Sequence, residues 1–222
     1  DSLAVGDLAT RQVVRTVSPG DEPADVVFAG TPQRAYVTLS SRQQLQVFDA
    51  AAPTTALNTL TLDGREPRAL AVSPDGSRVY VAMFESGNGS TALPIPAVNN
   101  VNGPYAGQIP PPNSGNQFSP PINAALPTPL RVAQIVRKDG AGAWRDDNGR
   151  DWSQFVTWNI ADNDVVIINT STLAVSYVPR LMTMVMALGV APDGRLLAVG
   201  TELKNEIRFE PNVKSIFVRS EL

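Results

Sequence analysis

The sequence predicts an all-β protein built from repeated antiparallel sheets, and its repeats, their spacing and their turns lead to this fold class. One phrase occurs twice: residues 69–81 read ALAVSPDGSRVYV and residues 187–199 read ALGVAPDGRLLAV. A more divergent copy, ADVVFAGTPQRAYV, occupies residues 24–37. Each copy holds two apolar runs around a turn, in which proline sets φ first and glycine accepts a positive φ later. Units this short cannot bury a hydrophobic face alone, so they must stack.

The spacing of the copies identifies the kind of sheet. Tyr36 and Tyr80 are 44 residues apart. A period of about 40–45 residues with four short strands is typical of the blades of a β-propeller. Pro74 and Pro192 are 118 residues apart, which is more than two periods, so one blade carries a large insertion. We therefore expect β-propeller blades of four antiparallel strands each.

Strands are expected where β-branched, aromatic or alternating residues run between turn residues. The expected strands are residues 3–5, 11–16, 24–29, 34–39, 44–49, 56–61, 68–73, 78–84, 164–169, 173–178, 187–191, 195–200, 206–210 and 213–219. These strands, about fourteen in all, make about three and a half blades, because the first two form the outer pair of a blade without its inner pair. A closed propeller has 4–8 blades. We therefore expect an incomplete ring, completed by another chain or segment, since exposed sheet edges invite pairing.

The insertion divides the chain into three parts: blades at residues 1–86, the insertion at 87–161 and further blades at 162–222. Its first half, 94–129, is rich in proline, which excludes helix and central strand, so we expect it to be extended and mobile. Its second half, 140–160, holds all three tryptophans of the chain. Large aromatic side chains bury much surface, so we expect this half to be folded and packed.

Composition excludes several classes of function. The chain has 222 residues, 43% of them hydrophobic, and a net charge of −3, so it is globular and a poor candidate for nucleic acid binding. It contains no cysteine and no histidine. Disulfides, thiolate or imidazole metal sites and serine–histidine hydrolysis are therefore excluded for this chain. No apolar run approaches the ~20 residues that span a bilayer.

One loop concentrates oxygen ligands around Gly149, and it is the candidate metal site. Its members are Asp146, Asp147, Asn148 and Asp151. Calcium binds 6–8 oxygen atoms, and a short loop of Asp and Asn around a glycine can supply several of them. The spacing is not that of an EF-hand, because Arg150 stands at a ligand position and no glutamate closes the loop. The two interpretations are a calcium site and a surface turn; no other cofactor is expected.

The aromatic residues of the same region form a candidate binding site, made of Trp144, Trp152, Phe155 and Trp158. These side chains could present a platform to a carbohydrate or protein partner, or form a small core that anchors the insertion. Two weaker candidates lie elsewhere. Met182, Met184 and Met186 alternate along an expected strand, as core residues or Cu(I) ligands. Glu85, Glu202 and Glu206 lie near equivalent strand ends, where paired carboxylates could act as acid and base.

The segments Tyr36-Val37-Thr38-Leu39 and Tyr80-Val81-Ala82-Met83, each after a Pro/Gly turn, resemble the YVTN-type repeat of seven-bladed bacterial β-propellers. The resemblance covers about residues 1–86 and 162–222. It implies a seven-bladed ring and an exported protein, located in the periplasm or outside the cell. The tract 146–153 is similar to an insertion of large propeller proteins, some of which are fused to cytochrome-type domains.

Three functions remain open. The first is a non-enzymatic binding or scaffolding segment of an exported protein, with a protein partner and with the insertion as recognition surface. The second is a non-catalytic propeller part of a periplasmic redox enzyme whose haem or quinone lies on another domain or chain. The third is a hydrolase or lyase at the propeller mouth, which the absence of histidine disfavours.

Overall fold

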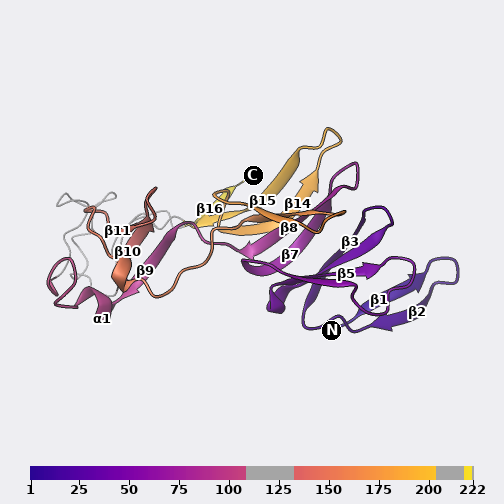
Figure 1. The fold of residues 1–222 in the computed structure, drawn as a ribbon, viewed down its shortest axis with the longest axis horizontal. Coiled ribbons are helices and arrows are strands. Elements are labelled where there is room, and N and C mark those ends of the chain that lie inside the picture. The colour runs from indigo at the N-terminus through magenta and orange to yellow at the C-terminus, as the bar shows by residue number, and fades with distance from the viewer. Residues whose placement is uncertain (109–132, 204–217, 222) are drawn as a thin grey trace, which may run out of the picture. The chain divides into compact units, whose positions relative to one another are not determined.

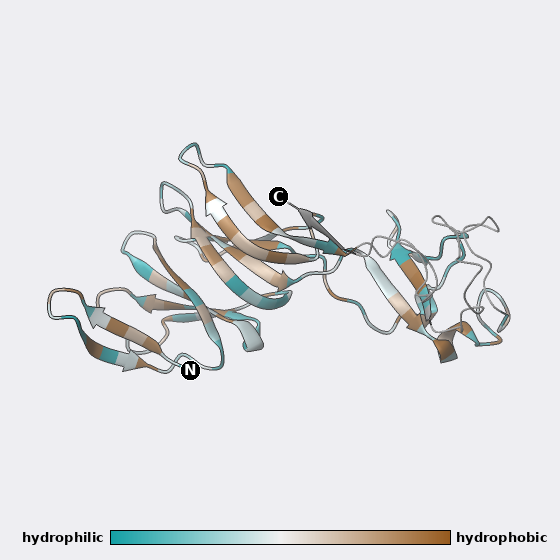
Figure 2. Cartoon of the chain, turned by 180° about the vertical axis from the view of Figure 1, so that it is seen from behind, coloured by the Kyte–Doolittle hydropathy of each residue, from teal (hydrophilic) through white to brown (hydrophobic). Residues whose placement is uncertain are grey.

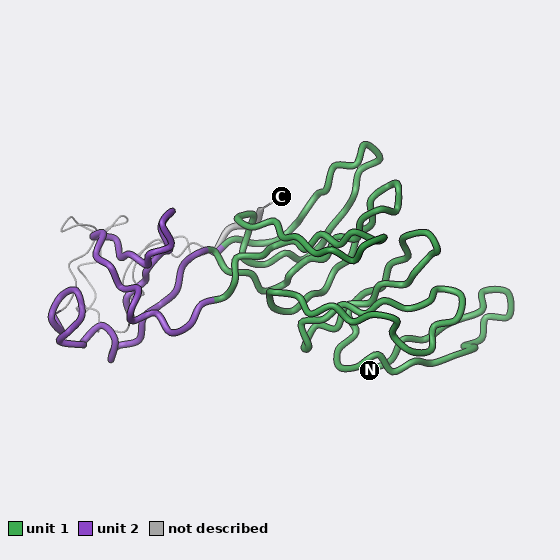
Figure 3. Tube along the Cα trace, viewed as in Figure 1, with its two compact units in different colours: residues 1–88, 160–202, 220–222 green, residues 89–159, 203–219 purple. Residues whose placement is uncertain are grey.

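The computed structural model describes residues 1–108, 133–203 and 218–221 and is an all-β structure (Figure 1). The chain forms two compact units, which Figure 3 distinguishes by colour. Unit 1 comprises residues 1–88, 160–202 and 220–222, and unit 2 comprises residues 89–159 and 203–219.

The first complete blade is an antiparallel sheet of four strands in sequence order. Its strands are β3 (Pro23–Ala29), β4 (Arg34–Leu39), β5 (Gln44–Asp49) and β6 (Asn58–Thr61). Tyr36 pairs with Val27 on one side and with Val47 on the other. A 3-10 turn, Ser40–Arg42, connects β4 to β5, and Gln43 closes it with a φ of 54°. The link between the second and third strands of this blade is therefore only four residues long, 40–43.

The second blade has the same strand order but is interrupted by the insertion. Its strands are β7 (Arg65–Val72), β8 (Arg78–Glu85), β12 (Val165–Asn169) and β13 (Val175–Val178). Tyr80 pairs with Ala71 on β7 and with Ile167 on β12. The insertion thus leaves the chain after the second strand of the blade and returns at the third, and β8 and β12 pair directly.

Two further sheets flank these blades. The first consists of β1 (Leu3–Asp7) and β2 (Gln12–Val17), so the chain begins with a two-stranded sheet as expected. The other contains β14 (Met184–Val190), β15 (Leu196–Leu203) and β16 (Val218–Glu221). In the part of the chain that the structure describes, no strand joins this sheet to β1 or β2, so the ring of blades is incomplete. The strand expected at 206–210, and most of that at 213–219, lies outside the described residues.

The repeated turns have the geometry that their residues predict. The N–H of Gly76 donates to the carbonyl of Ser73 at 2.8 Å, and the N–H of Gly194 donates to that of Ala191 at 2.8 Å. The glycine φ values are +69° and +87°, a region that side chains rarely occupy. Both Pro-Asp-Gly turns therefore close tight hairpins, β7–β8 and β14–β15.

The core of unit 1 lies between its sheets, because successive side chains of a strand point to opposite faces. On β4, Ala35 and Val37 pack toward the β1–β2 sheet, while Tyr36 belongs to the cluster shared with the second blade. On β8, Val79 and Val81 join that cluster; Ala82 faces the last sheet. Figure 2 shows this alternation of apolar and polar residues along the strands. The largest cluster contains Ala29, Tyr36, Leu45, Val47, Leu62, Leu70, Val79, Val81, Met83, Val166 and Ile168.

Unit 2 is a small sheet with its own core. Its strands are β9 (Ser90–Pro94), β10 (Ala133–Lys138) and β11 (Trp144–Arg145), in the order β11-β10-β9. None of the three was expected from the sequence. A short helix, α1 (Ile95–Val98), follows β9, and Val98 is buried in the core of this unit. The expectation of an extended tract is therefore wrong for residues 95–98, and residues 109–129 of that tract lie outside the described residues.

Among the described residues, no helix has the length and the apolar character needed to cross a membrane.

Candidate functional site

The buried carboxylate of Asp146 holds the oxygen-rich loop of unit 2 together by accepting hydrogen bonds from neighbouring residues. One oxygen, Oδ1, accepts hydrogen bonds from the backbone N–H groups of Asn148 and Arg150, both at 2.9 Å. The other oxygen, Oδ2, accepts the indole N–H of Trp152 at 2.9 Å. Three donors of the loop thus occupy most of the acceptor capacity of one carboxylate.

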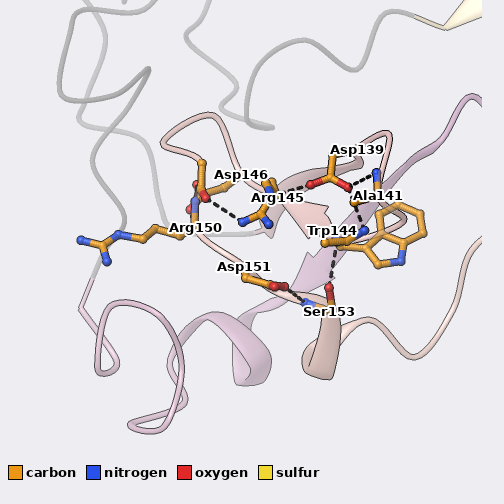
Figure 4. A network of polar contacts seen from close by, with 10 residues as sticks. Asp139, Ala141, Trp144, Arg145, Asp146, Arg150, Asp151 and Ser153 are labelled. Atoms are coloured by element: carbon orange, nitrogen blue, oxygen red, sulfur yellow. Dashed lines mark hydrogen bonds and ion pairs between the residues drawn. The ribbon is translucent and has the colours of Figure 1, made fainter.

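A second polar network holds the strand that carries Trp144 (Figure 4). The guanidinium of Arg145 donates to Asp139 at 2.6 Å, and the backbone N–H groups of Ala141 and Ala143 donate to the same carboxylate. The hydrogen bond from Arg145, followed by those from the backbone, lowers the pKa of Asp139 below its usual value. On the other side, the Ser153 hydroxyl accepts the N–H of Trp144 at 2.9 Å. These contacts fix a turn and a strand end.

The structure brings the four predicted metal ligands into one loop but does not converge them. Asp147 and Asp151 are exposed, and Asp151 accepts the backbone N–H of Ser153 at 2.8 Å. Within residues 1–108, 133–203 and 218–221, no three acidic side chains gather closely enough to hold a metal ion. These hydrogen bonds account for the loop as a turn. Calcium binding by this loop stays a prediction.

The four aromatic residues divide into core and surface. Trp152 is fully buried and Trp144 nearly so, and both belong to the core of unit 2. Phe155 packs against the indole of Trp152 edge-on, with ring centroids 5.8 Å apart. Trp158 is 61% exposed. Since buried side chains cannot present a face to a ligand, Trp144 and Trp152 serve the core, and the prediction of an aromatic binding site now rests on the exposed Trp158 and the half-buried Phe155.

Tyr105 extends this core toward the Asp146 loop. Its ring centroid lies 6.1 Å from that of Trp152, and the guanidinium of Arg150 stands 5.9 Å from the ring centre. Burial and the neighbouring Asp146 carboxylate raise the pKa of Tyr105 to about 12. The phenol therefore stays protonated at neutral pH, and the loop presents no ionised tyrosine.

The structure does not show either weaker candidate, the three methionines or the three glutamates, as one group among the residues that it describes. Met182 is buried before β14 begins, whereas Met186 is 54% exposed at an irregularity of the β14–β15 pairing between Val185 and Ala187. The methionines therefore do not form the uniform stripe that simple alternation predicts. Glu85 forms an ion pair with Arg65 at 3.5 Å, and Glu206 lies outside the described residues.

An exposed apolar face on the last sheet is a feature that the residue pattern did not single out. On β15, Ala198 packs toward the second blade, and a side chain at Gly200 would collide with the backbone of Met184. Leu197 and Val199 alternate with these residues and are 52% and 45% exposed. Between the two complete blades, by contrast, the corresponding apolar faces pack into a cluster of eleven buried residues. This sheet therefore has one face packed and one face open.

A pocket of about 390 Å³ that is widely open to solvent, called the cavity below, lies between the two repeated turns of unit 1. It is lined by Ser73, Pro74, Asp75, Ser77, Arg78, Tyr80, Pro192, Asp193 and Gly194. The turns were identified from the sequence, but no site was predicted there. The sequence did contain one indication that the two blades differ near this position. Asp49 and Asn169 end equivalent strands of the two blades, and only Asp49 is charged.

Comparisons with known proteins bear on the fold. No protein-family model matches the chain, and no curated protein sequence matches it. A solved structure with a similar fold is hydrazine synthase from Kuenenia stuttgartiensis, with a TM-score of 0.50 and 14% sequence identity. The match covers 99% of this chain and 43% of that chain. At this identity the likeness concerns the fold alone, and this chain spans less than half the length of the similar one.

Proposed function

We propose that this chain is a non-enzymatic binding and scaffolding segment of a β-propeller, and that its open sheet docks a further blade-type sheet. The observation that carries the proposal is the alternation on β15. Leu197 and Val199 stand where the complete blades bury their apolar residues, yet they are about half exposed. Covering apolar surface contributes roughly 25 cal/mol per Å².

The occupant that fits this face is another four-stranded antiparallel sheet, supplied by a further segment or a second chain. Unit 1 already stacks its sheets face to face, through clusters that join each sheet to the next. The open face continues that series, and its alternating apolar residues, Leu197 and Val199, resemble the pattern of the faces that are already covered. The resemblance to YVTN-type repeats adds the expectation of an exported, periplasmic or extracellular protein.

Cysteine labelling tests the docking directly, because the chain contains no cysteine of its own. The variant Val199→Cys, in the assembly purified from its native host, should react with a maleimide much more slowly than after denaturation. Leu57→Cys is the matched control, since Leu57 is 50% exposed in the loop before β6 and away from the open face. Equal labelling of both cysteines in the native assembly would overturn the proposal.

A second candidate function is a non-catalytic propeller part of a redox enzyme. The likeness to a synthase favours it. The lack of histidine and cysteine excludes histidine-ligated haem and thioether-attached haem on this chain, so this function places the haem or quinone on another domain or chain. The absorption spectrum of the same native assembly distinguishes the two functions. Haem or quinone bands would favour the redox enzyme, and a spectrum of aromatic residues alone would favour the scaffold.

A further inference from the structure

We propose that the cavity between the two Pro-Asp-Gly turns binds a small zwitterion that carries one carboxylate and one ammonium group, as an amino acid does. This site goes beyond the scaffolding role and does not depend on how the ring is completed. Its volume of about 390 Å³ lies at the small end of the usual range for ligand pockets, about 300–1,000 Å³.

Arg78 supplies the positive charge, and comparison with the first blade shows why it is available. Arg34 occupies the equivalent position on β4 and forms an ion pair with Asp49 at 2.9 Å, directly across the strand pair. Arg78 stands opposite Asn169, which carries no charge. In the part of the chain that the structure describes, the Arg78 guanidinium has no ion pair, and Arg78 is one of the residues that line the cavity. A free guanidinium fits a carboxylate in a bidentate manner.

Tyr80 also lines this cavity and is 6% exposed. The equivalent Tyr36 is fully buried in the interface between the two complete blades. There the turns meet directly: the N–H of Gly30 donates to the carbonyl of Gly76 at 3.1 Å, and the Thr170 hydroxyl donates to the same oxygen at 3.1 Å. At the next interface the corresponding turns stand apart and leave the cavity. One interface is thus closed by hydrogen bonds, while its counterpart is open to a ligand.

Two carboxylates, Asp75 and Asp193, line the cavity beside the single guanidinium. The hydroxyl of Ser73, together with the N–H and hydroxyl of Ser77, lowers the pKa of Asp75 to about 2, so Asp75 is ionised at neutral pH. Asp193 is held by Arg195 at 2.8 Å. Three donors already occupy most of the acceptor capacity of Asp75, whereas Asp193, in the described part of the chain, accepts only two hydrogen bonds, both from Arg195, and keeps free acceptor capacity. Within the described residues, Asp75 has no ion pair, so its negative charge disfavours a simple anion, whereas a zwitterion offers its ammonium to the carboxylates and its carboxylate to Arg78.

The test titrates the full chain with glycine and follows the amide NMR signals of Gly76 and Gly194. Acetate and methylammonium, which each carry one of the two charges, are titrated in parallel. We expect shifts that saturate with glycine and smaller, non-saturating shifts with either half. The variant Arg78→Leu should weaken glycine binding by roughly tenfold or more, the usual size of a lost charged hydrogen bond. The matched variant Arg34→Leu should leave binding unchanged.

A second variant, Asn169→Asp, recreates the pairing of the first blade. We expect the new carboxylate to engage Arg78 and to weaken glycine binding while the fold is retained, because Asp49 already serves this position in the first blade. Three results would overturn the proposal: no saturating shift with glycine, equal saturation with acetate, or equal loss of binding in the Arg34 and Arg78 variants.

Discussion

The two complete blades share a strand order and a register, and they differ at a few matched positions. In each blade a tyrosine in the second strand pairs with both neighbouring strands. The first blade links its second and third strands through four residues, 40–43, whereas the second blade carries unit 2 at that link. The matched pairs that differ in environment or charge are Tyr36 and Tyr80, Arg34 and Arg78, Asp49 and Asn169, and Gln44 and Asp164.

The comparison of the two blades shows which features of the repeat are kept and which vary. The apolar alternation is retained in both blades, because a single slip would turn each core residue to the wrong face. The link and the charged pair at the strand end vary, because neither contributes to the core between the sheets. The second blade therefore differs from the first at two places: it carries an insertion where the first has a short link, and it borders a cavity at its turn.

The largest effect is expected in the insertion, which is present only in the second blade. Trp152→Ala removes the fully buried indole of unit 2 and leaves Asp146 without its indole donor. We expect unit 2 to lose about 3–5 kcal/mol of unfolding free energy, as is usual for a large buried aromatic residue. Hydrogen exchange of the β10 amides should report this loss, while exchange of the β4 amides stays unchanged.

Trp158→Ala is the control for the indole itself, because Trp158 is 61% exposed. It should change the stability of unit 2 by less than about 0.5 kcal/mol. Faster exchange in β4 after Trp152→Ala would mean that the first blade depends on the insertion, contrary to the comparison.

A smaller effect on stability is expected when Tyr36 and Tyr80 are each replaced by phenylalanine. The Tyr36 hydroxyl is buried without a hydrogen-bond partner, and burial raises the pKa of this phenol. Tyr36→Phe removes the unpaired group and should stabilise unit 1 by about 1 kcal/mol, since an unsatisfied buried polar group costs about 1–3 kcal/mol. Tyr80→Phe should leave stability unchanged. Urea denaturation of both variants checks this, and destabilisation by Tyr36→Phe would reveal a partner for the hydroxyl.

The smallest effect concerns pH. Asp164 is buried directly before the third strand, β12, at the position where the first blade has Gln44. Its Oδ2 accepts the N–H of Leu181 at 2.7 Å, and its Oδ1 has no partner. Burial raises the pKa of Asp164 above the usual 3.8, so the folded state binds this proton more tightly than the unfolded chain. The stability that this proton contributes is complete below the usual pKa and is lost as the pH rises through the folded pKa.

Thermal unfolding measured between neutral pH and pH 4 should therefore show a larger gain on acidification for the wild type than for Asp164→Asn. Asp162→Asn is the control, because Asp162 accepts a backbone N–H from the same loop, that of Arg180. An identical pH dependence for the wild type and Asp164→Asn would exclude a raised pKa at this position.

The repeated strands could be predicted because their signal is local. Alternation around a Pro-Asp-Gly turn needs only about ten residues, and it located β3–β5, β7 and β8 within a few residues. The strands of unit 2 escaped prediction because β9 ends in Pro94 and its partner β10 lies some forty residues later. No turn signal joins them. Their pairing depends on the core around Trp152, which is a tertiary effect.

The sites depended even more on contacts between distant residues. The sequence located Asp146 but did not show that its carboxylate is occupied by Trp152. The availability of Arg78 depends on Asn169, its cross-strand neighbour, which follows it only after the whole insertion. The half-blade at the chain start was predicted, since its two strands lie close in sequence.

The link between β8 and β12 also bears on the order in which the blades fold. Residues 86–164 separate these strands, a loop roughly twenty times longer than 40–43 in the first blade, and closing it costs about 2–3 kcal/mol more in chain entropy. Inside unit 2, however, the Thr91 hydroxyl donates to the carbonyl of Trp158 at 3.1 Å, which brings the two ends of the insertion together. If the insertion folds early, the effective loop between β8 and β12 becomes shorter. The segment that interrupts the second blade would then lower the entropy cost of pairing its two halves.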